Sequence, residues 1–128
     1  MTVDRSTLSS NSATYGGGIS ADFGSVVVRN STLSNNSAVY GGGISDGNSV
    51  VQVSDSTLSN NVASGIGGGI YVDTGSEVHV SLVTLSNNSA PFGGGIGINN
   101  GNSSTTVISS TLSFNSATND GGGRTQSG

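Results

Sequence analysis

Residues 26–44 read VVVRNSTLSNNSAVYGGGI, and this stretch decides the fold because its features recur along the whole chain. The tripeptide Thr-Leu-Ser begins at five positions, separated by steps of 25, 25, 27 and 27 residues. A repeat of roughly 20 to 50 residues is typical of solenoids, in which each copy stacks on its neighbours. We therefore interpret the 128 residues as a single domain of five repeats, approximately 1–25, 26–50, 51–77, 78–104 and 105–128.

Each copy carries the same residues at fixed distances from its Thr-Leu-Ser. Val stands four residues before the Thr, Asn four residues after it and Ala six residues after it, and a glycine triplet follows. Ile comes after the triplet in four copies, and Arg124 takes its place in the last. The resulting columns are Val3, Val28, Val53, Val80 and Val107; Leu8, Leu33, Leu58, Leu85 and Leu112; Asn11, Asn36, Asn61, Asn88 and Asn115; Ala13, Ala38, Ala63, Ala90 and Ala117; and Ile19, Ile44, Ile70 and Ile96.

Short apolar stretches between Gly, Asn and Asp turns predict strands, because no segment shows the 3.6-residue period of an amphipathic helix. In the second copy we expect three strands, at residues 26–28, 32–34 and 42–44. Three short strands per repeat make one turn of a parallel β-helix. The predicted fold class is therefore all-β, a single-stranded parallel β-helix (β-solenoid) of about five turns.

Stacking explains why the columns are so regular. Equivalent residues in neighbouring turns would lie about 4.8 Å apart, so inward positions need side chains that stack on themselves. The Val, Leu, Ala and Ile columns meet that need. The Asn column is costly to bury unless its amides pair along the stack and hold the turns. The glycine triplets suit a corner with positive φ or a close approach of two backbones.

The segments Leu8–Asn11 to Leu112–Asn115, each followed by its glycine triplet, resemble the paired FxxN and GG[A/I/L/V] motifs of the chlamydial polymorphic outer-membrane protein repeat. Leu replaces the Phe of that pattern in all five copies, and Arg124 departs from it in the last. The resemblance implies a right-handed, pectate-lyase-like β-helix. It also implies an extracellular or cell-surface location with adhesive or scaffolding roles, and it brings no catalytic residues.

Composition narrows the function. Gly, Ser, Asn and Thr make up more than half of the chain, which without the repeat would indicate a disordered segment. Three Arg and no Lys argue against nucleic acid, and the absence of Cys excludes disulfides and thiolate chemistry. No apolar run is long enough for a membrane span. No signal peptide opens the chain, so we expect any export signal outside this segment.

The most regular outward feature is a pair of hydroxyl columns. If the Leu of each Thr-Leu-Ser points inward, its two neighbours point outward on the same strand. Such a flat face resembles the ice-binding face of β-solenoid antifreeze proteins, but Thr and Ser also suit any solvated strand. The columns comprise Thr7, Thr32, Thr57, Thr84 and Thr111, with Ser9, Ser34, Ser59, Ser86 and Ser113.

Acidic and aromatic residues also recur once per turn. Asp22, Asp46 and Asp73 stand beside Gly in the outward loops, but one carboxylate per loop falls short of a Ca²⁺ site, so we interpret them as turn residues and expect no metal or cofactor. Glu77 and His79 share a strand face, and nothing repeats or supplements them. We therefore expect no catalytic residues and no enzyme activity.

An aromatic stripe precedes the glycine triplets. Tyr15, Tyr40 and Phe92 occupy this position, and Ile66 stands there in the third copy. The stripe either binds a polysaccharide or simply packs over a corner.

Two classes of function remain. No cap is evident at either end of the repeats, and the two ends are nearly in register. The preferred hypothesis is a structural solenoid that stacks end to end into a fibre or forms part of an adhesin. The alternative is a binding module, for ice through the hydroxyl face or for polysaccharide through the aromatic stripe.

Overall fold

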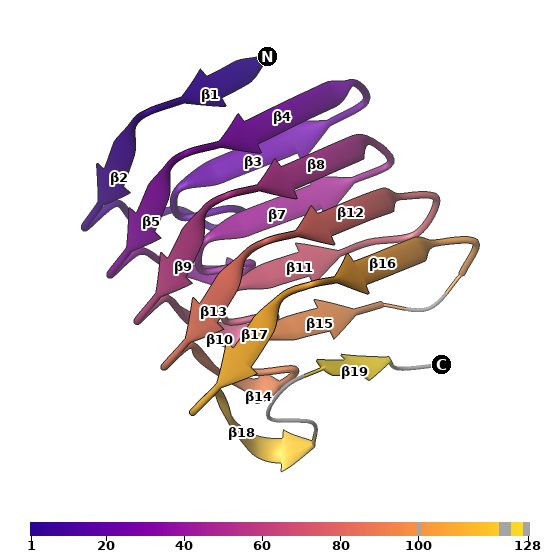
Figure 1. Cartoon of the computed structure of the whole chain (residues 1–128). Coiled ribbons are helices and arrows are strands. Elements are labelled where there is room, and N and C mark those ends of the chain that lie inside the picture. The colour runs from indigo at the N-terminus through magenta and orange to yellow at the C-terminus, as the bar shows by residue number, and fades with distance from the viewer. Residues whose placement is uncertain (100, 121–123, 127–128) are drawn as a thin grey trace.

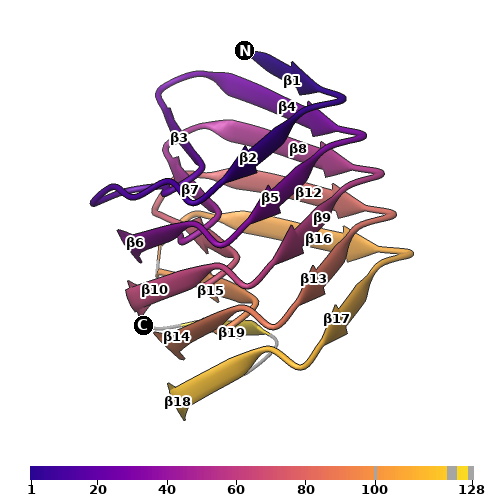
Figure 2. The same ribbon diagram turned by 90° about the vertical axis from the view of Figure 1, so that its left-hand side faces the viewer.

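The computed structural model describes residues 1–99, 101–120 and 124–126, and in it the chain winds into a stack of parallel strands (Figure 1). Successive layers follow the chain from the indigo N-terminal strand to the yellow C-terminal strands, and a view turned by 90° shows the same order (Figure 2). All pairings between the named strands are parallel, and each joins a strand to its equivalent in the next repeat. The parallel β-helix predicted from the repeat is confirmed.

The strands form four sheets, which we call A to D in the order in which the chain visits them. Sheet A contains β1 (Thr2–Asp4), β4 (Ser25–Arg29), β8 (Val50–Ser54), β12 (Glu77–Ser81) and β16 (Ser104–Ile108). Sheet B contains β2 (Thr7–Ser9), β5 (Thr32–Ser34), β9 (Thr57–Ser59), β13 (Thr84–Ser86) and β17 (Thr111–Ser113). Sheet C contains β6 (Ser37–Tyr40), β10 (Val62–Ile66), β14 (Ser89–Phe92) and β18 (Ser116–Asp120). Sheet D contains β3 (Ile19–Asp22), β7 (Ile44–Gly47), β11 (Ile70–Val72), β15 (Ile96–Ile98) and β19 (Arg124–Gln126).

The expectation of three strands per turn is wrong, because each complete turn has four. The segment 37–40, which we had not assigned to a strand, forms β6, and the strand expected at 42–44 begins only at Ile44. In the first turn the place of sheet C is taken by isolated bridges from Ser12 to Ser37 and from Tyr15 to Tyr40. The glycine triplet therefore forms the corner between sheets C and D rather than part of a strand.

Residues with positive φ shape all four corners of a turn, and the corner from D to A uses Phe23, Asn48, Gly75 and Gly101. The corner from A to B uses Arg5, Asn30, Asp55, Leu82 and Ser109, and the corner from B to C uses Ser10, Asn35, Asn60, Asn87 and Phe114. The first glycine of the triplet has positive φ at Gly16, Gly41, Gly67 and Gly93. The fifth triplet, residues 121–123, lies outside the described residues. Because Asn and Gly tolerate this conformation better than other residues, the sequence marks the corner from A to B least clearly.

The second and third glycines of the triplet allow neighbouring layers to approach closely. A Cβ atom on Gly42 would overlap the carbonyl oxygen of Gly68 and lie 2.6 Å from the carbonyl oxygen of Val62. A Cβ atom on Gly43 would lie 2.6 Å from the carbonyl oxygen of Gly69. Both explanations offered for the triplet, positive φ and close approach, therefore hold at different positions within it.

The core is a column of aliphatic side chains that runs along the axis. In the inner layers the Val, Leu and Ile columns are buried, as at Val53, Leu58 and Ile70. Their equivalents in the first and last layers, Val3, Leu8, Val107 and Leu112, are partly buried against the same cluster. Two inward columns were not singled out from the sequence: Val26, Val51 and Val78 in sheet A, and Ala21, Val72 and Ile98 in sheet D.

Candidate functional site

The asparagine column forms a continuous ladder of hydrogen bonds inside the corner between sheets B and C. Asn36, Asn61 and Asn88 are fully buried, Asn115 is half-buried and Asn11 is exposed. The Nδ2 of Asn36 donates to Oδ1 of Asn61 at 3.0 Å, and the backbone N–H of Asn36 donates to the same oxygen at 3.0 Å. The Nδ2 of Asn61 donates in turn to the carbonyl oxygen of Leu33 at 3.0 Å. Every donor and acceptor of the buried amides is therefore used, which removes the cost of burying them.

A second polar column was missed in the sequence. Ser31 and Ser56 are buried at the corner between sheets A and B, where the backbone N–H of Ser31 donates to Oγ of Ser56 at 3.1 Å. The hydroxyl of Ser31 donates to the carbonyl oxygen of Arg29 at 2.7 Å. The available signal was a Ser directly before Thr-Leu-Ser in four copies, with Val83 in the other.

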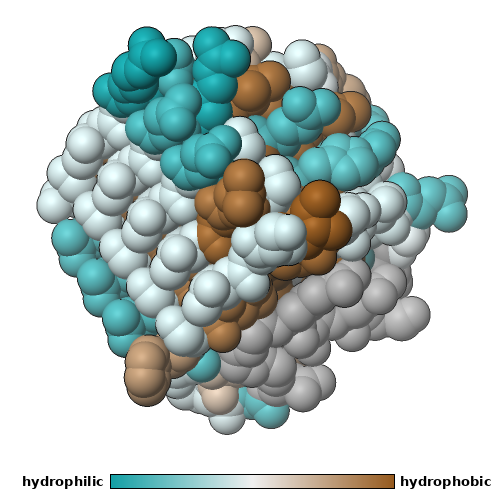
Figure 3. All heavy atoms as spheres, in the orientation of Figure 1, coloured by the Kyte–Doolittle hydropathy of each residue, from teal (hydrophilic) through white to brown (hydrophobic). Residues whose placement is uncertain are grey.

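The predicted hydroxyl face lies on the outside of sheet B. Across its five strands Thr pairs with Thr and Ser with Ser, without a shift in register. The Leu between them is inward, so the hydroxyl side chains are half-exposed or exposed. Over these strands the surface is pale and arranged in parallel rows (Figure 3), which means that it is neither strongly polar nor strongly apolar. No described side chain of this face is charged.

The Ala column lies along sheet C, and only part of it is buried, although we expected all its members to point inward. Ala63 and Ala90 are buried, Ala38 and Ala117 are half-buried, and Ala13 is exposed. In the first turn no strand equivalent to β6 forms, and only the two isolated bridges connect this segment to β6. Ala13 is therefore left without the sheet that covers its counterparts.

The aromatic stripe differs from the prediction at its third position. Tyr15 stacks on Tyr40 with ring centroids 5.2 Å apart, as expected from the register. The next ring is Tyr71, from strand β11, whose centroid lies 5.1 Å from that of Tyr40. Ile66 pairs with Tyr40 along the sheet, but a bulge shifts the register of β10 at this point, and the Ile66 side chain packs over Gly97. Phe92 remains 39% exposed.

The acidic residues do not form one outward column. Asp22 is outward in β3, and the register of sheet D places Gly47, not Asp46, beside it. Asp46 pairs with Ala21 and Val72 on the inner face and is fully buried. The interpretation of Asp46 as a turn residue in an outward loop is therefore wrong. A shift of one residue along a strand sends a side chain to the opposite face, and the loop spacing in the sequence could not show that shift.

Asp46 is a buried carboxylate without a hydrogen-bond partner on either oxygen. The nearby hydroxyl of Ser49 donates to the carbonyl oxygen of Gly47, and that of Ser76 donates to the backbone carbonyl of Asp46 itself. Burial raises the pKa of Asp46 to about 7, and the charge of Asp73 acts in the same direction. The proximity of Ser49 and Ser76 opposes this rise in the pKa without cancelling it.

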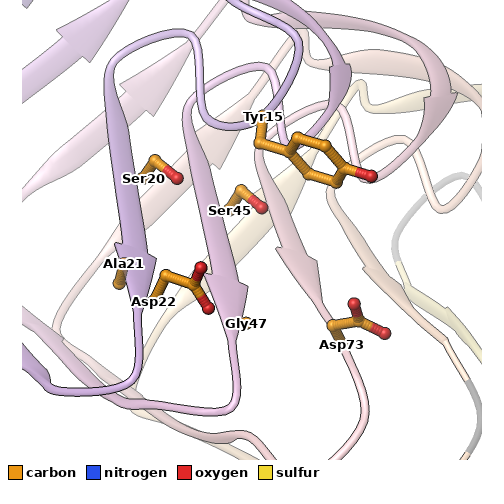
Figure 4. Close-up of a pocket in the computed structure, with 7 residues that line it drawn as sticks. All are labelled: Tyr15, Ser20, Ala21, Asp22, Ser45, Gly47 and Asp73. Atoms are coloured by element: carbon orange, nitrogen blue, oxygen red, sulfur yellow. The ribbon is translucent and has the colours of Figure 1, made fainter.

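A pocket of about 240 Å³ opens on the outer side of sheet D, beside the first ring of the aromatic stack. Its lining includes Tyr15, Ser20, Asp22, Ser45 and Asp73. These side chains come from the segment before the first glycine triplet and from the layers of β3, β7 and β11, and they face the same space (Figure 4). The sequence had placed Tyr15 and the two aspartates in separate features, and only the winding of the chain brings them together.

Comparison with protein families agrees with this architecture. The family model described as right-handed beta helix region matches residues 1–125, almost the entire chain. The chain belongs to the right-handed β-helix family. Neither a curated protein nor a solved structure matches it. Because one fold carries many activities, membership shows the handedness and architecture and assigns no reaction.

The remaining polar groups of this β-helix are dispersed. Nε2 of His79 lies 2.6 Å from Oε1 of Glu77 on the exposed face of sheet A, so the pair expected to share a face does so. Within the described residues, no three His, Asp or Glu side chains gather closely enough to hold a metal ion. The described part of the chain also contains no helix long and apolar enough to cross a membrane.

Proposed function

We propose that this β-helix is a structural module of an extracellular or cell-surface protein, and that its repeated layers, rather than a reaction centre, perform its function. The observation that carries the proposal is the complementarity of each layer to itself. Toward the following layer, each buried Asn presents its backbone N–H and its Nδ2 as donors. Toward the preceding layer it presents Oδ1 as the acceptor of the same two bonds, as Asn61 does for Asn36.

Self-complementary layers can be added without new chemistry. The backbone groups of each strand pair with the next strand, and the Val, Leu and Ile side chains stack on their own kind. The next layer can belong to the same chain or to another copy, because the bonds between layers are identical. This supports a role as an extended stalk or adhesin segment, and also end-to-end stacking of copies into a fibre.

An inserted layer tests the structural proposal. A second copy of residues 26–50 placed between residues 50 and 51 preserves the register of all four sheets. We expect this longer chain to fold and to have a higher unfolding free energy and melting temperature, because the stability of solenoids grows with each interface between layers. The matched control carries Asn36→Leu in the inserted copy only, and its stability should fall below that of the longer chain. A longer chain that is less stable than the original would contradict the proposal.

Assembly is tested separately. Sedimentation velocity and electron microscopy over a wide concentration range should show species that lengthen along one axis, with the strand spacing of about 4.8 Å parallel to that axis. Discrete monomers at every concentration would rule out assembly into a fibre. The role as a structural segment within one chain would then be tested by the insertion experiment alone.

The register of sheet B favours a second candidate, binding to ice. Five Thr and five Ser side chains form a two-dimensional array on parallel strands, and the array is free of charge in the described structure. Thermal hysteresis of the purified chain is the expected observation. The variant Thr57→Lys, at the centre of the array, should abolish it, whereas His79→Lys on sheet A should not. A chain without thermal hysteresis would exclude this candidate.

A further inference from the structure

We propose that the pocket beside Tyr15 binds a neutral pyranose unit of a glycan, with the sugar ring stacked on Tyr15 and its hydroxyls held by Asp22 and Asp73. This binding site lies on sheet D and is distinct from the interfaces between layers that carry the structural proposal. The two proposals therefore stand or fall separately.

Tyr15 forms the aromatic wall of the pocket, and two further tyrosine rings packed behind it hold it in place. Tyr71 is 4% exposed, and its hydroxyl accepts a hydrogen bond from Nδ2 of Asn99 at 3.3 Å. Tyr40 stacks on Tyr71, and Tyr15 stacks on Tyr40 with an angle of 20° between the ring planes. Tyr15, the last ring of this stack, is 50% exposed. An exposed ring on a fixed base offers an apolar face for the C–H groups of a sugar at little entropic cost.

The floor of the pocket is open between two carboxylates. Gly47 lies between Asp22 and Asp73 in the register of sheet D, and a Cβ atom at Gly47 would lie 3.2 Å from Oδ1 of Asp22. Any side chain at this position would fill the space that both carboxylates border. Oδ1 of Asp73 is oriented by the backbone N–H of Thr74 at 2.8 Å and by Nδ2 of Asn99 at 3.1 Å. The hydroxyls of Ser20 and Ser45 complete the polar lining.

The charge of the pocket selects among glycans. The two Arg side chains that the structure describes, Arg5 and Arg29, both lie beside Asp4, at 3.8 Å and 3.4 Å. No described cation therefore neutralises Asp22 and Asp73, and the pocket repels uronic acids and sulfated sugars. An ionised carboxylate accepts hydrogen bonds and donates none, so the ligand has to supply the donors. A neutral sugar supplies several hydroxyl donors for the two carboxylates and an apolar ring face for the Tyr15 ring.

Nuclear magnetic resonance of the ¹⁵N-labelled chain tests the site. The probes are three neutral disaccharides built from glucose, galactose and mannose, a digalacturonate and 1,4-diaminobutane. We expect at least one neutral disaccharide to shift the amide signals of Ser20, Ser45 and Gly47 with a Kd on the order of millimolar, and the digalacturonate to bind at least tenfold more weakly. No shift with any neutral disaccharide at about ten times that concentration would overturn the proposal. Tighter binding of the diamine or of the digalacturonate would overturn it as well.

Variants assign the binding to the named residues. Tyr15→Ala and Asp22→Ala should each weaken binding about tenfold, while Tyr15→Phe keeps the ring and should stay within about threefold. Phe114→Ala is the matched control, because Phe114 is an exposed aromatic residue at the corner between sheets B and C. Each variant is checked for an unchanged melting temperature. If Tyr15→Ala folds and binds as the original chain does, the proposed site is wrong.

Discussion

Neighbouring asparagines in this chain perform different tasks. Asn60 is exposed and adopts a left-handed conformation with φ of 56°, whereas Asn61 is fully buried in the hydrogen-bond ladder. The same pair recurs as Asn35 with Asn36 and as Asn87 with Asn88. One residue turns the chain and the next binds the layers together, so a single dipeptide supplies both functions of the corner.

The pair Asn60 and Asn61 gives a matched test at the residue scale. Asn61→Leu removes the partners of the Asn36 amide groups and of the Leu33 carbonyl, and should lower the unfolding free energy by about 3–5 kcal/mol. Asn60→Leu only places a less tolerant residue in the left-handed region and should cost about 1 kcal/mol. Urea denaturation of both variants measures the difference. Equal losses would mean that the ladder does not stabilise the fold.

Asp46 predicts an unusual dependence of stability on pH. Its folded pKa of about 7 lies above the ordinary aspartate value of 3.8, so the folded chain holds this proton more tightly than the unfolded chain. The stability associated with this group is fully present below about pH 4 and is lost progressively as the pH rises to 7, by an amount on the order of 4 kcal/mol. Asp46→Val, which copies Val72 in the same column, should abolish this loss and raise stability at pH 8.

Asp46→Asn separates titration from burial. The amide does not titrate, so the pH dependence should disappear, but a polar group stays buried and the gain at pH 8 should be smaller than for Asp46→Val. Chemical denaturation at several pH values between 4 and 8 measures all three chains. A native chain with the same stability across this range would show that Asp46 does not titrate as described.

At the scale of the structural element, the glycine corner between sheets C and D sets how closely the layers stack. Gly42→Ala forces a Cβ atom against backbone atoms of the next layer, which no rotamer change can relieve, and should cost about 3 kcal/mol or more. Gly24→Ala is the control, since a Cβ atom there meets nothing within 4 Å, and its stability should be unchanged or slightly higher. Thermal melts followed by circular dichroism compare the two. Similar melting temperatures would argue against the close approach at Gly42.

For the whole molecule, the number of neighbouring layers determines how much each residue contributes. Leu58 lies in the middle layer and is fully buried, whereas Leu8 lies in the first layer and is only partly buried. Leu58→Ala should cost about 2–5 kcal/mol, and Leu8→Ala about 1 kcal/mol. Hydrogen exchange should rank the layers in the same order, with the slowest amides in β9 and faster ones in β2. Uniform protection across the layers would contradict this gradient.

The sequence by itself determined the repeat, the parallel stacking and most of the core. These properties follow from residue identity at a fixed period, because a column of Leu or Asn can form only where equivalent positions stack. The pairing of Asn36 with Asn61 and the positive φ of the first glycine were predictable for the same reason. The cell-surface location and the assembly into a fibre stay predictions.

Only the tertiary structure decided where the chain departs from its own repeat. In sheet D, Asp46 pairs with the inward residue Ala21, whereas the outward residue Asp22 pairs with Gly47. Asp46 is therefore buried although Asp22 is not. The register of β10 is shifted by a bulge before Ile66, and the third ring of the aromatic stack is Tyr71, from the next strand. The pocket beside Tyr15 is lined by residues from three layers. Local spacing contains no information about contacts between layers whose loops and bulges differ in length, and so it could not reveal this pocket.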